Sequence, residues 1–210
     1  MKVLIACEYS GKVRDAFTAA GHDAMSCDLL PSDSINGEHY QGDVFDLPLH
    51  DFDLMIAHPP CTYLTNSGVC HLHTDPKRWP KMFDGADFFK RLLNAPVPRI
   101  AIENPIMHGY AKKLIGGVQQ DQLIQPYMFG HMEQKATCLW LKNLPDLVGT
   151  DDVKAQMLEL PKRERERLHY LPPSPDRWKL RSTTYSGIAD AMAAQWTNRL
   201  LQQPPIRRIA

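Results

Sequence analysis

The 210-residue sequence lacks a long apolar run and an excess of charge of either sign. No stretch approaches the ~20 consecutive apolar residues of a transmembrane helix, so no membrane-spanning helix is expected. Basic and acidic side chains number 24 each, and the formal net charge of zero argues against a broad basic surface for long duplex DNA. Hydrophobic residues make up 43% and charged residues 23%, which predicts a single folded domain over residues 1–210.

Cysteine is scarce and odd in number, and we expect no secretory leader before it. The five cysteines stand at positions 7, 27, 61, 70 and 138 and suggest no disulfide framework. The segment Cys70-His71-Leu72-His73 matches no established zinc spacing, so no metal site is expected. We expect thiols in the reducing cytoplasm of a bacterial or phage-infected cell, with one or two of them reactive.

Strand-like and helical patterns alternate along the chain. Strands are predicted over residues 2–7, 23–27, 53–57, 99–102, 122–128 and 137–141, and helices over 12–20, 81–93 and 187–201. Several of the strands are continuously apolar, which suits burial on both faces of a sheet. The pattern therefore predicts an α/β fold with a doubly wound, mostly parallel, Rossmann-like sheet.

The turn after the first predicted strand is poor in glycine. It reads Glu8-Tyr9-Ser10-Gly11 and contains a single glycine. A pyrophosphate needs the close backbone approach that a glycine-rich turn allows. The turn therefore favours a nucleoside cofactor without phosphate, such as S-adenosylmethionine, over NAD.

Polar or reactive side chains follow each of the first strands, at the edge where parallel sheets bind ligands. Asp28 follows the second strand, where a carboxylate can accept hydrogen bonds from ribose hydroxyls. Asp43 is placed to contact the base of the same nucleoside. For both residues the alternative interpretation is a helix cap or turn former.

Pro59-Pro60-Cys61 follows the predicted strand 53–57, and the two prolines would hold the thiol at the sheet edge. A thiolate there can add to C6 of a pyrimidine and make C5 nucleophilic. Cytosine also needs a proton or hydrogen bond at N3 as charge develops, and Glu103, after the next strand, is the candidate acid. The alternatives are a buried structural thiol and a surface carboxylate.

These motifs resemble those of the DNA cytosine-C5 methyltransferases. The resemblance covers roughly residues 1–142 and implies a Rossmann-like methyltransferase fold that uses S-adenosylmethionine. It implies methyl transfer to C5 of cytosine in DNA through a covalent bond between a cysteine thiol and C6. It assigns catalysis to Cys61, Glu103 and Asn104, and cofactor binding to Glu8, Tyr9, Ser10, Gly11, Asp28, Asp43 and Pro59.

The sequence departs from this family in two places. Gln134-Lys135-Ala136-Thr137 stands where the family has an arginine-bearing motif, and the DNA-reading region shrinks to about residues 143–184. So short a region is expected to read a flipped cytosine's neighbours weakly, which favours single-stranded DNA, a loosely specified duplex, or a second subunit (another copy or an accessory chain). Substrate contacts are assigned to Pro60, Lys135, Thr137, Arg177, Trp178, Lys179 and Arg181, with a solvated helix face as the alternative for the basic segment.

Three other functions are compatible with parts of the pattern. Methyltransferases that modify exocyclic amines carry a Pro-Pro pair at the position of Pro59-Pro60, with an acid or amide before it and an aromatic residue after it. This chain has His58 and Cys61 at those two flanking positions. A pyrimidine-nucleotide C5-modifying enzyme would use the same C6 addition and would need arginines near the loop. A catalytically inactive binding module would need neither Cys61 nor Glu103.

Overall fold

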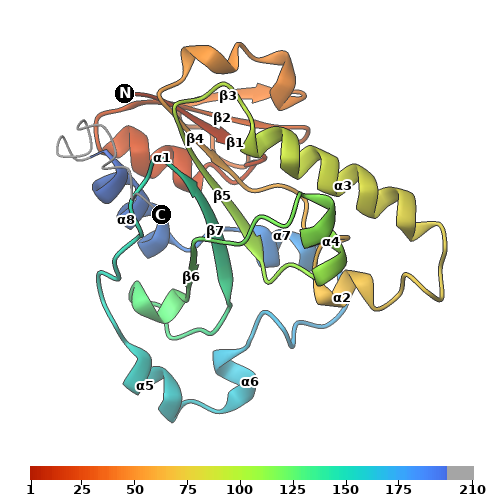
Figure 1. Ribbon diagram of the computed structural model, residues 1–210. Helices are drawn as coiled ribbons and strands as arrows, with labels where there is room; N and C mark the ends of the chain where they lie inside the picture. The colour runs from red at the N-terminus through yellow and green to blue at the C-terminus, as the bar shows by residue number, and fades with distance from the viewer. Residues whose placement is uncertain (198–210) are drawn as a thin grey trace, which may run out of the picture.

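A computed structural model describes residues 1–197, which form an α/β fold around one seven-stranded sheet (Figure 1). The strands are β1 (Lys2–Ala6), β2 (Asp23–Asp28), β3 (Glu38–Gln41), β4 (Leu54–Ala57), β5 (Arg99–Pro105), β6 (Gln122–Ile124) and β7 (Thr137–Lys142). Their order is β3-β2-β1-β4-β5-β7-β6. The first five strands are parallel, and β7 pairs antiparallel with both β5 and β6.

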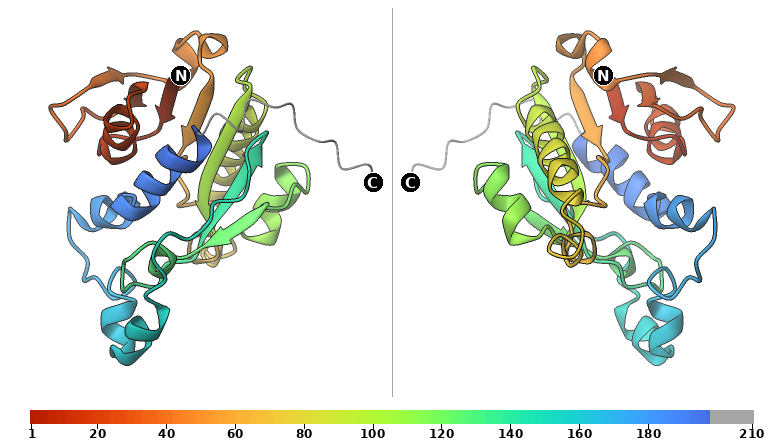
Figure 2. Two further views of the ribbon diagram at one scale, coloured as in Figure 1. Left: turned by 90° about the vertical axis from the view of Figure 1, so that its left-hand side faces the viewer. Right: turned by 90° about the vertical axis from the view of Figure 1, so that its right-hand side faces the viewer.

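Helices cover both faces of the sheet, because the central strands are apolar on both sides. Helices α1 (Lys12–Ala19) and α8 (Ser186–Trp196) pack on one face, with Ile5 and Ile56 in their core. Helices α3 (Arg78–Leu93) and α4 (Gly109–Leu114) pack on the other, with Leu4 and Met55. Figure 2 shows the two layers. The predicted doubly wound, mostly parallel, Rossmann-like fold is confirmed.

Several predicted boundaries were wrong for identifiable reasons. Strand 122–128 ends at Ile124, because Pro126 cannot donate to the ladder and instead begins a 3₁₀ turn, η3 (Pro126–Met128). Helix α3 begins three residues before position 81, at Arg78. Strand β3 was missed, because its sequence Glu-His-Tyr-Gln is polar, as an edge strand can be. The helix predicted over 187–201 spans Ser186–Trp196, and positions 198–201 lie outside the described residues.

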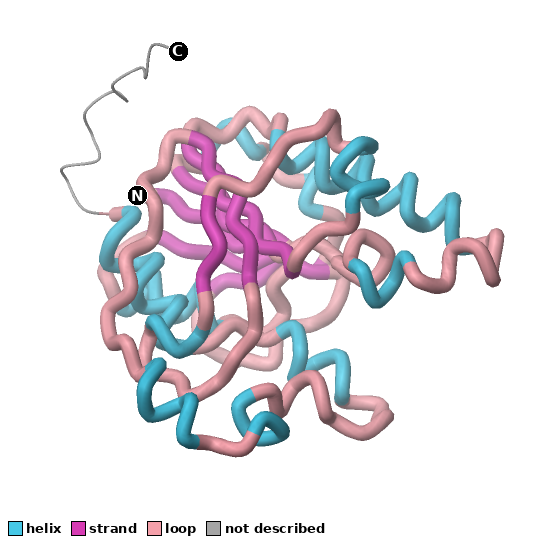
Figure 3. The backbone as a smooth tube through the Cα atoms, turned by 60° about the horizontal axis from the view of Figure 1, so that its bottom comes forward, coloured by secondary structure: helices cyan, strands magenta, loops and turns pink. Residues whose placement is uncertain are grey.

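Residues 143–184 cross the end of the sheet and contain three short helices. These are α5 (Lys154–Glu159), α6 (Lys162–Arg165) and α7 (Arg177–Ser182). Figure 1 shows α5 and α6 set apart from the sheet, whereas α7 returns toward it, and Figure 3 shows loops and short helices beyond the ends of the strands. The shorter elements elsewhere are α2 (Asn66–Val69) and the 3₁₀ turns η1 (Val44–Asp46) and η2 (Leu49–Asp51).

No helix within residues 1–197 has the length and apolar character needed to cross a membrane. In the same part of the chain, no cluster of three or more His, Cys, Asp or Glu side chains is arranged to hold a metal ion.

Candidate active site

The cleft of this protein lies at the point where the sheet changes its winding direction. Strands β1 and β4 are neighbours, and the chain leaves β1 toward β2 but leaves β4 toward β5. In open parallel sheets such a switch point opens a crevice beyond the carboxyl ends of the strands. The cleft here has a volume of about 1140 Å³, and its wall includes Tyr9, Asp28, Pro59, Pro60, Cys61, Lys135, Arg177, Trp178 and Arg181.

The turn after β1 is held together by hydrogen bonds to the carboxylate of Glu8. Glu8 is 4% exposed and accepts hydrogen bonds from the backbone N–H groups of Val13 at 2.7 Å and Arg14 at 3.2 Å. The Ser10 hydroxyl donates to the same carboxylate at 3.1 Å. Glu8 therefore occupies the N-terminus of α1, the place where a phosphate would bind in a dinucleotide fold.

Gly11 makes the backbone of this turn possible. Its φ is +72°, and a Cβ here would lie 2.6 Å from Nη2 of Arg14 and 2.7 Å from Cβ of Ser34. Cys7, which sequence reasoning did not single out, also has a left-handed backbone, at φ 58°, and lines the cleft. Burial, helped by the charge of Asp28, raises the pKa of the Cys7 thiol far above its usual range, so this thiol stays protonated.

Asp28 stands at the end of β2 and lines the cleft, as an acid that binds a nucleoside should. One of its carboxylate oxygens accepts a hydrogen bond from the backbone N–H of Leu30 at 3.0 Å. Leu29 and Leu30 follow it along the cleft and are 73% and 39% exposed. They add an apolar surface beside the carboxylate.

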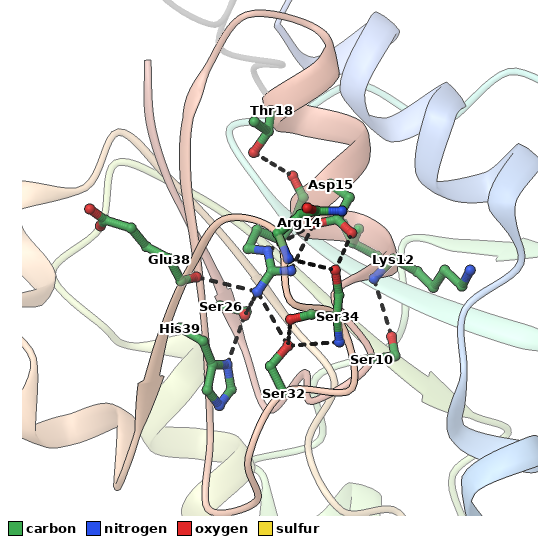
Figure 4. Close-up of polar contacts among 12 residues, drawn as sticks. Ser10, Lys12, Arg14, Asp15, Thr18, Ser26, Ser32, Ser34, Glu38 and His39 are labelled. Atoms are coloured by element: carbon green, nitrogen blue, oxygen red, sulfur yellow. Dashed lines mark hydrogen bonds and ion pairs between the residues drawn. The ribbon is translucent and has the colours of Figure 1, made fainter.

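A buried arginine holds the loop that carries these residues (Figure 4). Arg14 on α1 is fully buried, and its guanidinium donates to Asp15 at 2.8 and 2.9 Å. It also donates to the hydroxyl of Ser26 at 3.0 Å and, more weakly, to the hydroxyl of Ser32 and the carbonyl of Glu38, both at 3.4 Å. Because one guanidinium ties α1 to β2, β3 and the loop between them, the wall after Asp28 has a defined shape.

Asp43, by contrast, serves as a cap. Its side chain accepts a hydrogen bond from the backbone N–H of Phe45 at 2.9 Å and begins the 3₁₀ turn η1. Among the described residues it is not one that lines the cleft. The structure thus shows the capping role that the sequence left open, and contact with the cofactor stays a prediction.

Cys61, His58 and Glu103 come together between β4 and β5. They line a hollow of about 90 Å³ that shares most of its wall with the cleft. Nδ1 of His58 lies 3.1 Å from Oε2 of Glu103, and both side chains are nearly buried, with 11% and 13% exposed. The pairing of Ala57 with Ile102 brings the next two positions side by side on the same face of the sheet.

Charge and burial act in opposite directions on this pair. Burial opposes ionisation of Glu103, but contact with His58 outweighs it and holds the pKa of that carboxyl below its usual range. Burial also opposes protonation of His58, but Glu103 and then Glu8 outweigh it and raise the pKa of the imidazole. Both shifts favour an imidazolium beside a carboxylate.

The Cys61 thiol is partly exposed and its pKa is raised. Burial is the largest cause, and the nearby cations of Lys135 and Arg181 offset part of it. Lys135 is held by a hydrogen bond from its ammonium to the carbonyl of Arg181 at 2.8 Å. The thiol is therefore protonated near neutral pH, and a positive neighbour favours its conversion to thiolate.

Loss of that neighbour should slow the reaction of Cys61 with an alkylating agent. In Lys135→Met the pKa of the thiol rises further, so at pH 8 the rate of carboxamidomethylation by iodoacetamide falls by about 3- to 10-fold, as a shift of roughly half to one pKa unit implies. Peptide mapping by mass spectrometry measures the rate at this one cysteine. Lys142→Met, at the far end of β7, is the control with an unchanged rate, and equal rates in all three proteins would contradict the assigned neighbour.

Asn104 and Thr137 do not line the cleft within the described part of the chain. Asn104 is 1% exposed, and its amide donates to the carbonyl of Pro105 at 2.7 Å. Because side chains alternate along β5, Asn104 points to the face opposite Glu103. Thr137 is buried, and its hydroxyl donates to the carbonyl of Lys135 at 3.3 Å. Asn104 and Thr137 are thus buried residues that bond to the backbone next to the cleft and do not face it. The sequence pattern did not indicate this placement.

Helix α7 is docked on the first turn. The rings of Tyr9 and Trp178 lie 5.4 Å apart, and the Tyr9 hydroxyl donates to the carbonyl of Lys179 at 3.1 Å. The ammonium of Lys179 contacts Asp33 at 3.1 Å. Residues predicted to bind DNA thus touch residues predicted to bind the cofactor. Trp178 remains 47% exposed, so one surface of α7 is available to a substrate.

No family model matches the sequence, and no curated protein matches it. Among solved structures, the S. pombe Dnmt2 methyltransferase is similar to this chain, with a TM-score of 0.42 and 19% identity over 83% of this chain and 60% of that one.

 Two further similar structures are an Entamoeba histolytica methyltransferase, EhMeth, and a prophage-encoded E. coli protein described as a DNA modification methyltransferase. EhMeth is 13% identical over 72% of this chain and 56% of its own, with a TM-score of 0.44. The prophage protein is 18% identical over 76% of this chain and 55% of its own, with a TM-score of 0.41.

This chain spans less than two thirds of the length of each of these three proteins.

Proposed function

We propose that this chain is an S-adenosylmethionine-dependent methyltransferase that modifies C5 of cytosine in DNA, in the cytoplasm of a bacterial or phage-infected cell. The observation that carries the proposal is the shared location of two sets of side chains. Cys61 and Glu103 meet in one hollow, and that hollow opens into the cleft lined by Tyr9 and Asp28. A nucleophile, an acid and a nucleoside site thus converge at the switch point of the sheet.

The residues of the cleft fit the proposed cofactor. Asp28 offers a carboxylate for ribose hydroxyls, and Leu29, Leu30 and Pro59 offer apolar surface for a base. Glu8 already fills the N-terminus of α1, which leaves no anion site for a pyrophosphate. When bound, S-adenosylmethionine would supply an electrophilic methyl group on a sulfonium.

Cys61 would act on the pyrimidine through addition and elimination. Its thiol loses a proton to solvent, and the thiolate forms a bond to C6, which moves the C5–C6 electron pair onto C5 and the ring toward N3. A proton at N3, delivered through Glu103, neutralises the charge that develops there. After C5 has been methylated, solvent takes the C5 proton, the electrons of the C5–H bond restore the C5–C6 double bond, and the C6–S bond breaks to release the Cys61 thiolate. The N3 proton returns through Glu103.

The DNA would enter along α7 and the loop before β7. Lys135, Arg177 and Arg181 line the cleft beside the partly exposed ring of Trp178, which suits phosphate contacts combined with base stacking. The segment is short, so we propose a single-stranded or loosely specified DNA as partner, with a second copy or accessory chain completing recognition of a duplex.

A pyrimidine nucleotide is the second candidate substrate, and the structure strengthens it. Near the loop after Cys61 the sequence itself has only Lys77 and Arg78, but Arg78, Arg177 and Arg181 all line the cleft. Arginines in the lining suit a phosphate of a free nucleotide as well as one of DNA. The exocyclic-amine alternative is weaker, because His58, in the position of the required acid or amide, is engaged with Glu103.

Nucleoside mass spectrometry tests the function directly. DNA from a methylation-deficient host that expresses this chain should contain 5-methylcytosine, and DNA from the same host with an empty vector should not. N4-methylcytosine or N6-methyladenine would transfer the protein to the amine-modifying class. If the DNA is unchanged, incubation of the pure protein with labelled S-adenosylmethionine and either single-stranded DNA or pyrimidine nucleotides decides between the two substrates, and no label in either would contradict methyl transfer.

A further inference from the structure

The histidine before the two prolines is the strongest feature that the proposed function leaves unexplained. His58 directly follows β4, and its backbone N–H donates to the carbonyl of Ala6 at 2.9 Å, which extends the β1–β4 ladder by one residue. Its side chain lines both the hollow and the cleft. A buried titratable group at this point touches the acid that the reaction would use.

The geometry of the pair is incomplete in this structure. His58 Nδ1 lies 3.1 Å from Glu103 Oε2, but the two groups are not aligned as a hydrogen bond. Within the described residues, Nε2 of His58 and Oε2 of Glu103 are buried with no hydrogen-bond partner. Buried polar atoms are normally paired, and unpaired ones are typical of sites that complete their hydrogen bonds when a ligand binds.

The surroundings favour a proton on this pair. Glu8, from the turn after β1, faces His58 with negative charge, and Lys135, from the loop before β7, faces it with positive charge. The positive charge of Lys135 also lowers the pKa of the Glu103 carboxyl and of the Cys61 thiol. Because the contact with Glu103 is the closest of these charges, His58 is stabilised as an imidazolium while Glu103 remains a carboxylate.

We propose that His58 is a positioning residue that orients Glu103 and holds the proton that Glu103 passes to N3 of the pyrimidine. The inference rests on the proposed function for its reaction step. In that step the thiolate of Cys61 bonds to C6, the Nδ1–H bond of His58 breaks, and an N3–H bond forms. Glu103 accepts one proton and gives up one, so it ends as a carboxylate, and the total charge of the four groups is unchanged.

This arrangement predicts a particular pH profile. Below the pKa of His58, the rate of methyl transfer should rise tenfold per pH unit as Cys61 thiolate accumulates. Above that pKa the rate should level off, because loss of imidazolium offsets the gain of thiolate until the thiol itself has titrated. In His58→Gln the levelling should disappear, because the amide can still donate to Glu103 but cannot deliver a proton.

The test combines kinetics with a measurement that needs no substrate. His58→Gln should lower the single-turnover rate by roughly 100-fold at pH 8, the scale of a lost general acid, while the dissociation constant for S-adenosylmethionine and the melting temperature stay near the wild-type values. NMR titration of the imidazole in the free protein should give a pKa above 6.5 that falls in Glu103→Gln.

The possible outcomes separate this inference from the proposed function. A His58→Gln protein with the rate and pH profile of the wild type would overturn the proton role. The role would also be overturned if the pKa of the His58 imidazole were not raised and did not change in Glu103→Gln. If the imidazole titrates as expected but the wild-type protein transfers no methyl group, the proposed function fails and the proton delivery fails with it. His58→Ala, which removes both contact and proton, should be slower than His58→Gln if orientation also contributes.

Discussion

Cys61→Ala protein should form no covalent complex with DNA that contains 5-fluorocytosine, whereas the wild-type protein should be trapped when S-adenosylmethionine is present. Fluorine at C5 cannot leave as a proton does, so the bond between the thiol and C6 persists after methyl transfer. The same substitution should lower methyl transfer to ordinary cytosine by about 10⁴-fold or more, the scale of deleting a nucleophile. Denaturing gel electrophoresis detects the complex, and nucleoside mass spectrometry the loss of product.

A second thiol provides the matched control. Cys70 lies nine positions further along the chain and is exposed. Cys70→Ala should be trapped as efficiently as the wild-type protein, and thermal unfolding should confirm that both variants are folded. Trapping of Cys61→Ala would refute the assignment of the nucleophile, and the partly exposed cleft cysteine would then be a structural thiol.

Asp28→Ala should weaken binding of S-adenosylmethionine by about 5- to 150-fold, which corresponds to roughly 1–3 kcal/mol, the value of hydrogen bonds to a charged partner. The carboxylate stands at the end of β2 on the cleft wall, and the Arg14 contacts define the loop that follows it. Isothermal titration calorimetry with the full chain measures the dissociation constant in the absence of DNA.

Two further substitutions make this measurement specific. Asp28→Asn keeps the size of the side chain and should fall between the wild type and Asp28→Ala. Asp51→Ala removes an exposed acid that pairs with His50 and should bind as the wild type does. An affinity for S-adenosylmethionine that is unchanged in Asp28→Ala would remove this residue from the cofactor site.

The sequence predicted the layered fold well, because the signals for it are local. Continuous apolar strands alternate with amphipathic helices, and this periodicity requires burial on both faces of a parallel sheet. Tyr9 after β1, Asp28 after β2 and Cys61 after β4 also share one cleft, since parallel strands end at the same edge. The failures were local too, as at Pro126, which ends β6, and at the polar edge strand β3.

The tertiary structure decided which of the predicted residues meet. Strand order places β4 beside β5, and this register sets His58 against Glu103, a contact between residues 45 positions apart that no local pattern contains. The same alternation turns Asn104 to the opposite face of the sheet. Helix α7 closes on Tyr9 across a separation of 170 residues. The sequence by itself determined which chemical groups stand at the strand ends, because that depends on short-range periodicity. Their partners and charges depend on contacts between distant segments, which only the packed chain defines.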